Sequence, residues 1–192
     1  MLAFGPEPRQ QNERGGAVPF VAVEGAPESA CRTSTLPGGR TDFECSVHGR
    51  VQAVTDKSFE LICQGRTVRL KHLFPGAVRL GPLVGQEVGV SVLQSFEQEA
   101  LSRVRCLVTE AEGRIVLMSY FGPVSDFPAA DELGLDLSLS VVDAGWEAHF
   151  GAARWPLRAN QPLRLREGDH AYELVVTELE KDPVSAFLLR CD

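Results

Sequence analysis

The stretch VTDKSFE at residues 54–60 has a degenerate second copy, VVDAGWE, at residues 141–147. Both copies contain apolar residues, an acid, a small turn residue, an aromatic residue and a glutamate. Each copy later closes on a Val-Thr-Glu step, at residues 108–110 and 176–178. An acid and small residues between apolar segments are typical of a tight turn between antiparallel strands. The repetition therefore predicts one β-rich unit that occurs twice in tandem.

Alternation of apolar and polar residues continues around both turns. It is clearest at residues 88–92 of the first copy and at residues 135–141 of the second. Phe59 and Trp146 follow the turn at equivalent positions, and we expect both rings in the core because they bury large apolar areas. Short strands with frequent turns are typical of antiparallel barrels or sandwiches. The predicted fold class is mainly β, with two tandem small antiparallel β-barrel or sandwich units and an extended N-terminal arm.

Composition divides the chain into four parts. Residues 1–42 contain polar and glycine-rich turn segments and predict an extended or disordered N-terminal arm. Residues 43–122 form the first predicted unit, and residues 135–192 form the second. Between them, residues 123–134 (PVSDFPAADELG) contain two prolines and three acids, which break any periodic pattern and predict a linker.

One short segment of the arm, AVPFVAV at residues 17–23, favours β-structure. Pro19 fits an edge strand, where a missing N–H costs no ladder hydrogen bond. This segment leads to the hypothesis that the arm adds a strand to a neighbouring sheet, with Phe20 and Val21 as contact residues. A disordered tail is the alternative that the composition also allows.

The formal net charge of −7 is unevenly distributed. Residues 124–192 contain 6 basic and 13 acidic residues, whereas residues 44–123 contain 9 basic and 8 acidic residues, and residues 1–43 contain 4 and 5. An acidic second half repels phosphate backbones, so broad electrostatic binding of nucleic acid is disfavoured.

The cysteines and the N-terminus bear on the compartment. The five cysteines are Cys31, Cys45, Cys63, Cys106 and Cys191. Their number is odd, no CxxC motif occurs, and cysteines in strand patterns are usually small buried hydrophobes, so the sequence favours a reducing compartment. We see no signal peptide and no apolar run near the ~18 residues of a membrane-spanning helix. We therefore expect a soluble cytoplasmic protein without a membrane partner.

A basic face is predicted on the strand and connection after residue 65. Its candidate interaction residues are Arg66, Arg69, Lys71, His72 and Arg79. In the same copy, the segments GRV at 49–51, VTDKSFEL at 54–61 and GQEVGV at 85–90 resemble the opening of an S1/OB-type barrel. Barrels of this type bind single-stranded nucleic acid with exposed aromatics and a basic groove. The resemblance implies an alternative function, a single-stranded nucleic-acid-binding protein that uses the basic face.

Paired carboxylates recur in the two copies, Asp56 with Glu60 and Asp143 with Glu147. If the units enclosed a cleft, these groups could perform acid–base chemistry, which gives a third hypothesis of an enzyme site between the units. In a hairpin, however, an acid at the turn usually caps backbone N–H groups and a following glutamate faces water. We favour this structural interpretation.

The histidines do not have a metal-binding spacing. His48 and His72 could meet across strands near Cys45 or Cys63 and bind zinc. The sequence has no GxSxG motif and no glycine-rich phosphate loop. We therefore predict no catalytic, cofactor-binding or metal residues and no cofactor. The leading hypothesis is a non-enzymatic protein-interaction or assembly module, in which the arm docks on a partner or a sister chain.

Overall fold

The computed structural model describes residues 22–55, 58–71, 81–98, 100–143, 145–178 and 184–192. Within these residues the protein is mainly β with one short α-helix, which confirms the predicted class. The strands before residue 123 are β1 (Ala22–Glu24), β2 (Cys31–Leu36), β3 (Arg40–Val54), β4 (Ser58–Cys63), β5 (Arg66–Lys71), β6 (Glu87–Glu97), β7 (Ala100–Glu110) and β8 (Ile115–Gly122). The later strands are β9 (Leu137–Val142), β10 (Gly145–Phe150), β11 (Ala153–Pro156), β12 (Leu163–Glu167), β13 (His170–Glu178) and β14 (Val184–Arg190). The helical elements are the 3-10 turns η1 (Glu28–Ala30), η2 (Gly81–Leu83) and η3 (Val124–Asp126) and the helix α1 (Ala129–Leu133).

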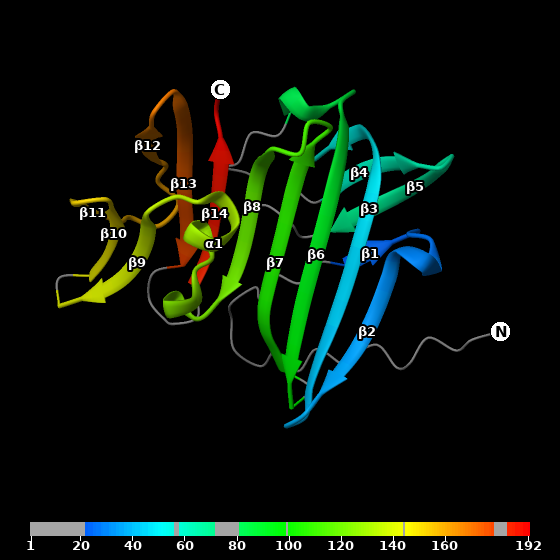
Figure 1. Ribbon diagram of the computed structural model, residues 1–192, viewed down its shortest axis with the longest axis horizontal. Coiled ribbons are helices and arrows are strands. Elements are labelled where there is room, and N and C mark those ends of the chain that lie inside the picture. The colour runs from blue at the N-terminus through cyan, green and yellow to red at the C-terminus, as the bar shows by residue number, and fades with distance from the viewer. Residues whose placement is uncertain (1–21, 56–57, 72–80, 99, 144, 179–183) are drawn as a thin grey trace.

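These strands form a long sheet and a small sheet (Figure 1). The long sheet has the order β1-β5-β4-β3-β6-β7-β8-β14-β13-β12 with β2 attached to β3, and the small sheet has the order β11-β10-β9. Of the two predicted forms, barrel and sandwich, a closed barrel is not formed within the described residues. Closure would require the terminal strands of a sheet to pair with each other, and β12 does not pair with β1 or with the small sheet there.

Strand β3 is the longest strand, and it organises the first half. It pairs with β2 near its start, with β6 along most of its length and with β4 near its end. Its register with β4 shifts between Val51 and Ala53, which is a bulge that bends the strand. At Gly49 the β4 backbone comes so close that an added Cβ would lie 2.4 Å from the carbonyl oxygen of Ile62. A glycine is therefore required where β3 comes closest to the end of β4.

Two hydrophobic cores lie on opposite faces of the long sheet. The first core includes Val47, Val51, Phe59, Leu61, Val68, Leu70, Val90, Val92, Cys106, Val108 and Leu117. The second core includes Leu107, Met118, Tyr120, Leu137, Leu139, Trp146, Ala148, Leu165, Leu174 and Leu188. Phe59 and Trp146 are 0% and 7% exposed, as the sequence predicts for core aromatics.

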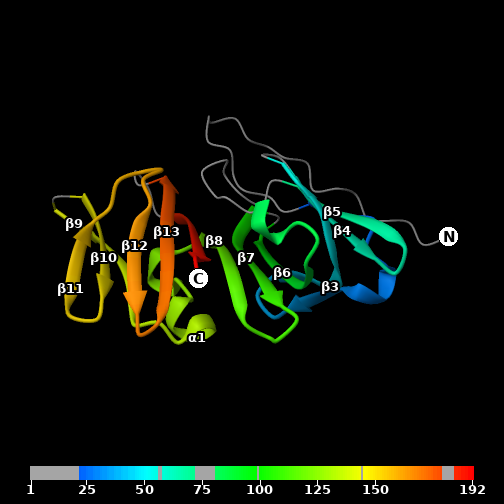
Figure 2. The same ribbon diagram turned by 90° about the horizontal axis from the view of Figure 1, so that it is seen from above.

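Strands β7 and β8 supply side chains to both cores because successive residues of a strand point to opposite faces. Cys106 and Leu117 face the first core, whereas Leu107 and Met118 face the second. Strand β14 pairs with β8 in register Leu188 to Met118 and continues the shared sheet. The two halves are therefore joined by backbone pairing of β8 with β14 and by side chains of β7 and β8 that pack in both cores. Figure 2 shows β8 between the two halves of the molecule.

Residues 22–42, predicted as part of an extended arm, are instead built into the chain's own sheet. Strand β1 pairs with β5, and β2 pairs with β3, which already begins at Arg40. A β-favouring segment gains the same ladder hydrogen bonds on its own sheet as on a partner, without the loss of translational freedom that association costs. Phe20 and Val21 lie outside the described residues.

The segment predicted as a linker, residues 123–134, packs onto the second core. Phe127 is 9% exposed and Ala129 is 0% exposed. The Tyr120 hydroxyl donates to the carbonyl oxygen of Pro123 at 2.8 Å, and its ring meets Phe127 edge-on at a centroid distance of 5.7 Å. Two arginines of β7 form ion pairs with this segment: Arg103 pairs with Asp126, and Arg105 pairs with Glu132. Residues 123–134 are therefore a packed part of the fold that is bound to the sheet.

Candidate basic edge

Of the predicted basic face, the structure describes the side chains of Arg66 and Arg69, and it pairs Arg69 with a carboxylate. The Nε of Arg69 donates to Oε1 of Glu60 at 2.7 Å, and Glu24 stands directly opposite Arg69 on the other neighbouring strand. This cross-strand row thus contains one cation between two carboxylates. Arg66 is exposed and has no ion pair with any described residue. The side chain of Lys71 and the residues His72 and Arg79 lie outside the described part of the chain.

Glu60 and Glu147, the two repeated glutamates, do not converge on one site. Glu60 lies on β4 and Glu147 on β10, and these strands are at opposite ends of the molecule in both ribbon views (Figures 1 and 2). Asp143 is exposed at the turn before β10, and Asp56 lies outside the described residues. The hypothesis of an enzyme site that joins these four groups is therefore not supported.

Glu147 has a polar neighbourhood of its own on the outer face of the small sheet. Its Oε2 lies 3.5 Å from Nε2 of His149, and the same nitrogen lies 2.9 Å from Oγ of Ser140. A serine–histidine–carboxylate triad needs the carboxylate on the other ring nitrogen, where it orients the base. Both groups here meet the same nitrogen, so this cluster lacks the arrangement of a nucleophilic triad.

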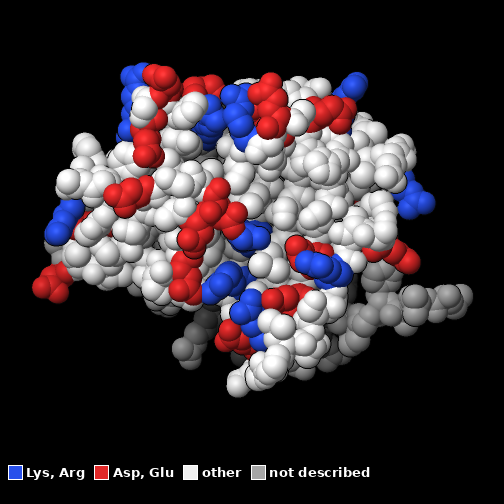
Figure 3. Space-filling model, viewed as in Figure 1, with Lys and Arg blue, Asp and Glu red and all other residues white. Residues whose placement is uncertain are grey.

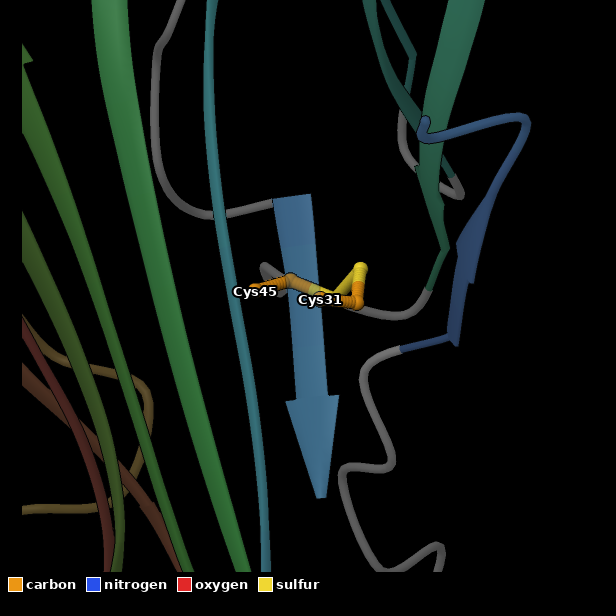
Figure 4. The surroundings of a disulfide bond; sticks show 2 residues. All are labelled: Cys31 and Cys45. Atoms are coloured by element: carbon orange, nitrogen blue, oxygen red, sulfur yellow. A yellow bond between two sulfur atoms is a disulfide. The ribbon is translucent and has the colours of Figure 1, made fainter. Parts of the chain in front are cut away.

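One cysteine pair is oxidised, which corrects the expectation of reduced cysteines. Cys31 and Cys45 face each other across β2 and β3 and form a disulfide with an S–S distance of 2.00 Å (Figure 4). Cys45 is thus not available as a thiolate ligand for the zinc site considered with His48, and His72 lies outside the described residues. The sequence could not reveal this pair, because its register depends on the turn between the two strands. The described residues contain no group of three His, Cys, Asp or Glu side chains that could hold a metal ion.

Cys63 and Cys106 agree with the prediction of small buried hydrophobes. They are 6% and 0% exposed and belong to the first core. Burial raises the pKa of the Cys106 thiol, because the interior disfavours the charged thiolate. This thiol is therefore a packing group and a poor nucleophile at neutral pH.

A second basic surface, which the sequence reasoning missed, lies on β12, the strand at the end of the long sheet, and on β11, an edge strand of the small sheet. We define the basic edge as the exposed residues Arg154, Arg158, Arg164 and Arg166. They come from β11, from the connection that follows it and from β12. Basic side chains are visible at this margin, over β12 and beside β11 at the left of Figure 3.

Three of the four arginines of the basic edge have no ion pair with a described residue, unlike almost all other described arginines. Arg164, whose side chain is 86% exposed, pairs with Glu173 at 3.1 Å. No ion pair joins Arg154, Arg158 or Arg166 to any residue that the structure describes. Outside this edge, every described arginine except Arg66 has a carboxylate partner; these are Arg32, Arg40, Arg50, Arg69, Arg103, Arg105, Arg114 and Arg190. Exposed cations without local partners remain able to attract an external anion.

The sequence contained a signal for this surface. Residues 153–166 (ARWPLRANQPLRLR) contain four arginines and no acid, whereas the rest of residues 124–192 contains 2 basic and 13 acidic residues. The net charge of the second half conceals this local excess, because averages over a whole half hide runs of fourteen residues. Charge summed over short windows would have found the basic edge.

The outward side of β12 also carries backbone groups that have no strand partner among the described residues. Glu167 and His170 close a two-residue hairpin turn, in which the closing pair exchanges backbone hydrogen bonds. Since these bonds alternate along an antiparallel strand, Leu165 and Leu163 bond toward β13, while the N–H and C=O groups of Arg164 and Arg166 point away from the sheet. No strand of the described residues pairs with that side of β12.

The free edge of β11 is less suitable for pairing. The N–H of Leu157 donates to the carbonyl oxygen of Trp146 at 2.8 Å, so alternate residues toward the start of β11 also face β10. Arg154 and Pro156 are then the residues whose backbone groups face outward. Pro156 has no N–H, and proline on an edge strand is a known protection against strand addition. Trp155, on the same strand, is 45% exposed.

Comparison of the chain with protein-family models, curated proteins and solved structures finds no match. Among the described residues, no helix has both the length and the apolar character needed to cross a membrane.

Proposed function

We propose that this chain is a non-enzymatic protein-interaction module made of two β-units in tandem, which contacts its partner through the basic edge. The observation that carries the proposal is the set of exposed arginines on and beside β12, three of which (Arg154, Arg158 and Arg166) have no ion pair with any described residue, in a half of the chain that is otherwise acidic. Electrostatic complementarity of this kind raises association rates and selects partners. The partner would therefore present negative charge to this edge.

The tandem organisation is supported by strand order. Each half contains two three-stranded meanders: β3-β4-β5 and β6-β7-β8 in the first, β9-β10-β11 and β12-β13-β14 in the second. The halves differ in that β3 pairs with β6, whereas β9 and β12 are not paired within the described residues. Loss of that pairing in the second copy leaves an edge of β12 free, which would give the copies different roles.

Residues 22–42 are not proposed as a docking arm, because their strands are already paired within the chain. Residues 1–21, which include Phe20 and Val21, stay in the proposed interface. Deletion of those residues tests this part: partner binding should weaken if they contribute, and an unchanged dissociation constant would remove them from the interface.

A single experiment tests the interaction function as a whole. The full-length protein is titrated with extended peptides of acidic, neutral and basic composition, and its self-association is measured by sedimentation velocity. We expect saturable binding of at least one peptide class, with a change in Trp155 fluorescence because this ring is exposed beside the basic edge. A monomer that binds none of the peptides would overturn the proposal.

Single-stranded nucleic acid is the second candidate, favoured by the exposed ring of Trp155 on β11, the strand that also contains the exposed Arg154. Stacking on an aromatic ring and ion pairs with phosphates are the usual means of binding single strands. The formal net charge of −7 opposes it. Titration with a short single-stranded DNA at several salt concentrations tests it, since phosphate binding must weaken steeply with added salt.

A further inference from the structure

We propose that β12 accepts an extended acidic segment of a partner protein as an additional antiparallel strand of the long sheet. This inference rests on the proposed interaction function and specifies its partner. It joins two independent features of the same five residues: outward backbone groups without a strand partner and exposed arginine side chains. An added strand would satisfy the first, and its carboxylates would pair with Arg166 and give Arg164 a second acidic neighbour beside Glu173.

The hydrogen-bonding part follows from the register of the β12–β13 hairpin. Leu165 pairs with Tyr172 and Leu163 with Leu174, so the ladder toward β13 is complete at these positions. Arg164 and Arg166 then each offer one N–H and one C=O to an incoming strand. Two such residues on alternate positions match the spacing of a peptide strand, and main-chain bonds of this kind supply affinity in strand-addition complexes.

The side chains specify which strand would fit. Leu165 is 5% exposed and faces the second core, so Arg164 and Arg166 lie on the opposite face of β12. Residues directly across an antiparallel pair have neighbouring side chains, and opposite charges there are favourable. A partner strand would place Asp or Glu across from the two arginines and an apolar residue beside Leu165. The predicted recognition sequence alternates acidic and apolar residues.

A second copy of this chain is a poorer occupant. When two β12 strands pair antiparallel about a two-fold axis, each residue lies opposite a residue of the other strand whose side chain is on the same face of the sheet. Arg164 and Arg166 would then meet only arginines, and like charges directly opposite are destabilising. Nucleic acid can pair with the side chains but offers no peptide N–H and C=O ladder to the outward groups. An acidic peptide strand therefore uses both features of the edge.

Fluorescence anisotropy of labelled peptides with the full-length protein provides the test. One peptide alternates Glu with Val, a second has the same composition with its glutamates in one block, and a third alternates Lys with Val. A short single-stranded DNA is the fourth probe. We expect the alternating acidic peptide to bind at least ten-fold more tightly than the blocked peptide and the DNA, and the Lys peptide not to bind.

Variants of β12 separate charge from backbone. The double variant Arg164→Glu and Arg166→Glu should weaken the alternating peptide at least ten-fold. Arg166→Pro removes an outward N–H but no bond to β13, and it should weaken binding more than Arg166→Ala, which removes the same charge. Arg66→Glu is the matched control, because Arg66 is also exposed and without an ion pair among the described residues but lies on β5. Circular dichroism and thermal unfolding verify that each variant folds.

The outcomes distinguish this inference from the function on which it rests. Equal binding of the alternating and blocked peptides, or equal effects of Arg166→Pro and Arg166→Ala, overturns strand addition while the interaction function stands. Equal affinity for peptide and DNA shows a general polyanion surface and also overturns it. Peptide binding that is lost only with Arg66→Glu moves the site to β5. Absence of binding to every peptide overturns strand addition, and it also overturns the interaction function if the protein is a monomer.

Discussion

Cys31 and Cys45 lie directly opposite each other on β2 and β3, with their Cα atoms 4.1 Å apart and their sulfurs bonded. The bond closes a loop with a sequence separation of 14. Cross-linking a loop of this length stabilises a folded protein by about 3 kcal/mol in the chain-entropy model. The disulfide thus fastens the N-terminal strand β2 to the long strand around which the first half is built.

The first prediction concerns this bond. Without reductant, the unfolded protein should contain three reactive thiols, those of Cys63, Cys106 and Cys191, and reduction should raise the number to five. Reduction, or the double variant Cys31→Ser and Cys45→Ser, should lower the free energy of unfolding by about 3 kcal/mol. Thiol titration in denaturant and urea unfolding measure both effects. Five thiols in the unreduced protein would contradict the prediction.

Truncation from the N-terminus gives the second prediction. Removal of residues 1–42 deletes β1, β2 and the start of β3 together with the disulfide, so the remaining chain should unfold at lower urea concentration or fail to fold. Removal of residues 1–21 leaves all of these elements in place and serves as the control. Equal urea midpoints for the two truncated proteins would show that β1 and β2 contribute nothing to the fold.

The sharing of β7 and β8 between two cores gives the third prediction. Residues 22–122 alone would expose Leu107, Met118 and Tyr120, which the second half normally covers. We expect this fragment to lack a cooperative unfolding transition, and the full chain to unfold in one transition by fluorescence and circular dichroism. In the full chain, Leu188→Ala should cost about 2–5 kcal/mol, because this buried side chain stands opposite Met118 across the junction. Two separate transitions in the full chain would refute the sharing of β7 and β8.

These predictions also separate what the residues reveal from what they do not. Alternation around Phe59 and Trp146 predicts strands and core aromatics correctly, because burial on one face leaves a period of two in the sequence. The pairing of β14 with β8 could not be predicted, since nothing local to either strand specifies a partner about seventy residues away. The continuous apolar character of β8 is the trace that it leaves, because a strand buried on both faces loses its alternation.

The candidate site was predicted less well, and for a physical reason. Arg69 looks free in the sequence, but its neutralisation by Glu60 depends on cross-strand register. Arg154 and Arg166 do not differ from Arg69 as single residues of the sequence, but in the folded chain neither has an ion pair with a described residue. The pairing of the two cysteines could not be predicted for the same reason, because the turn of a hairpin decides which residues of its two strands lie opposite each other.

The fourth prediction concerns the close approach of the β3 and β4 backbones at Gly49. Gly49→Ala would place a Cβ 2.4 Å from the backbone oxygen of Ile62, and only movement of a strand could relieve the clash. We expect a loss of about 1–3 kcal/mol in the free energy of unfolding, the usual cost of overpacking. Gly81→Ala is the matched control, because nothing lies within 4 Å of its added Cβ, and it should be nearly neutral. Urea unfolding compares the two, and equal midpoints would contradict the predicted clash.

The last prediction is a pH dependence that arises from the partly buried ion pair between Arg40 and Asp42. Arg40 donates to both carboxylate oxygens of Asp42, at 2.8 and 3.0 Å, and this hydrogen bonding lowers the pKa of Asp42 below its ordinary value. A carboxyl group with a lowered pKa in the folded state contributes stability above its unfolded pKa of about 3.9. That contribution is lost as the pH falls through the folded pKa, because the neutral acid no longer attracts Arg40.

Asp42→Asn should therefore lower stability at pH 7 and have a smaller effect at acid pH, so that its pH profile is flatter than that of the unmodified protein. Urea midpoints measured from pH 7 to pH 2 test this expectation. Asp131→Asn is the control, because Asp131 is exposed and has no ion pair with any described residue, and its profile should follow the unmodified protein. A difference between Asp42→Asn and the unmodified protein that is constant with pH would mean that the ion pair with Arg40 does not carry the effect, since a purely steric change has no reason to vanish when the carboxylate is protonated.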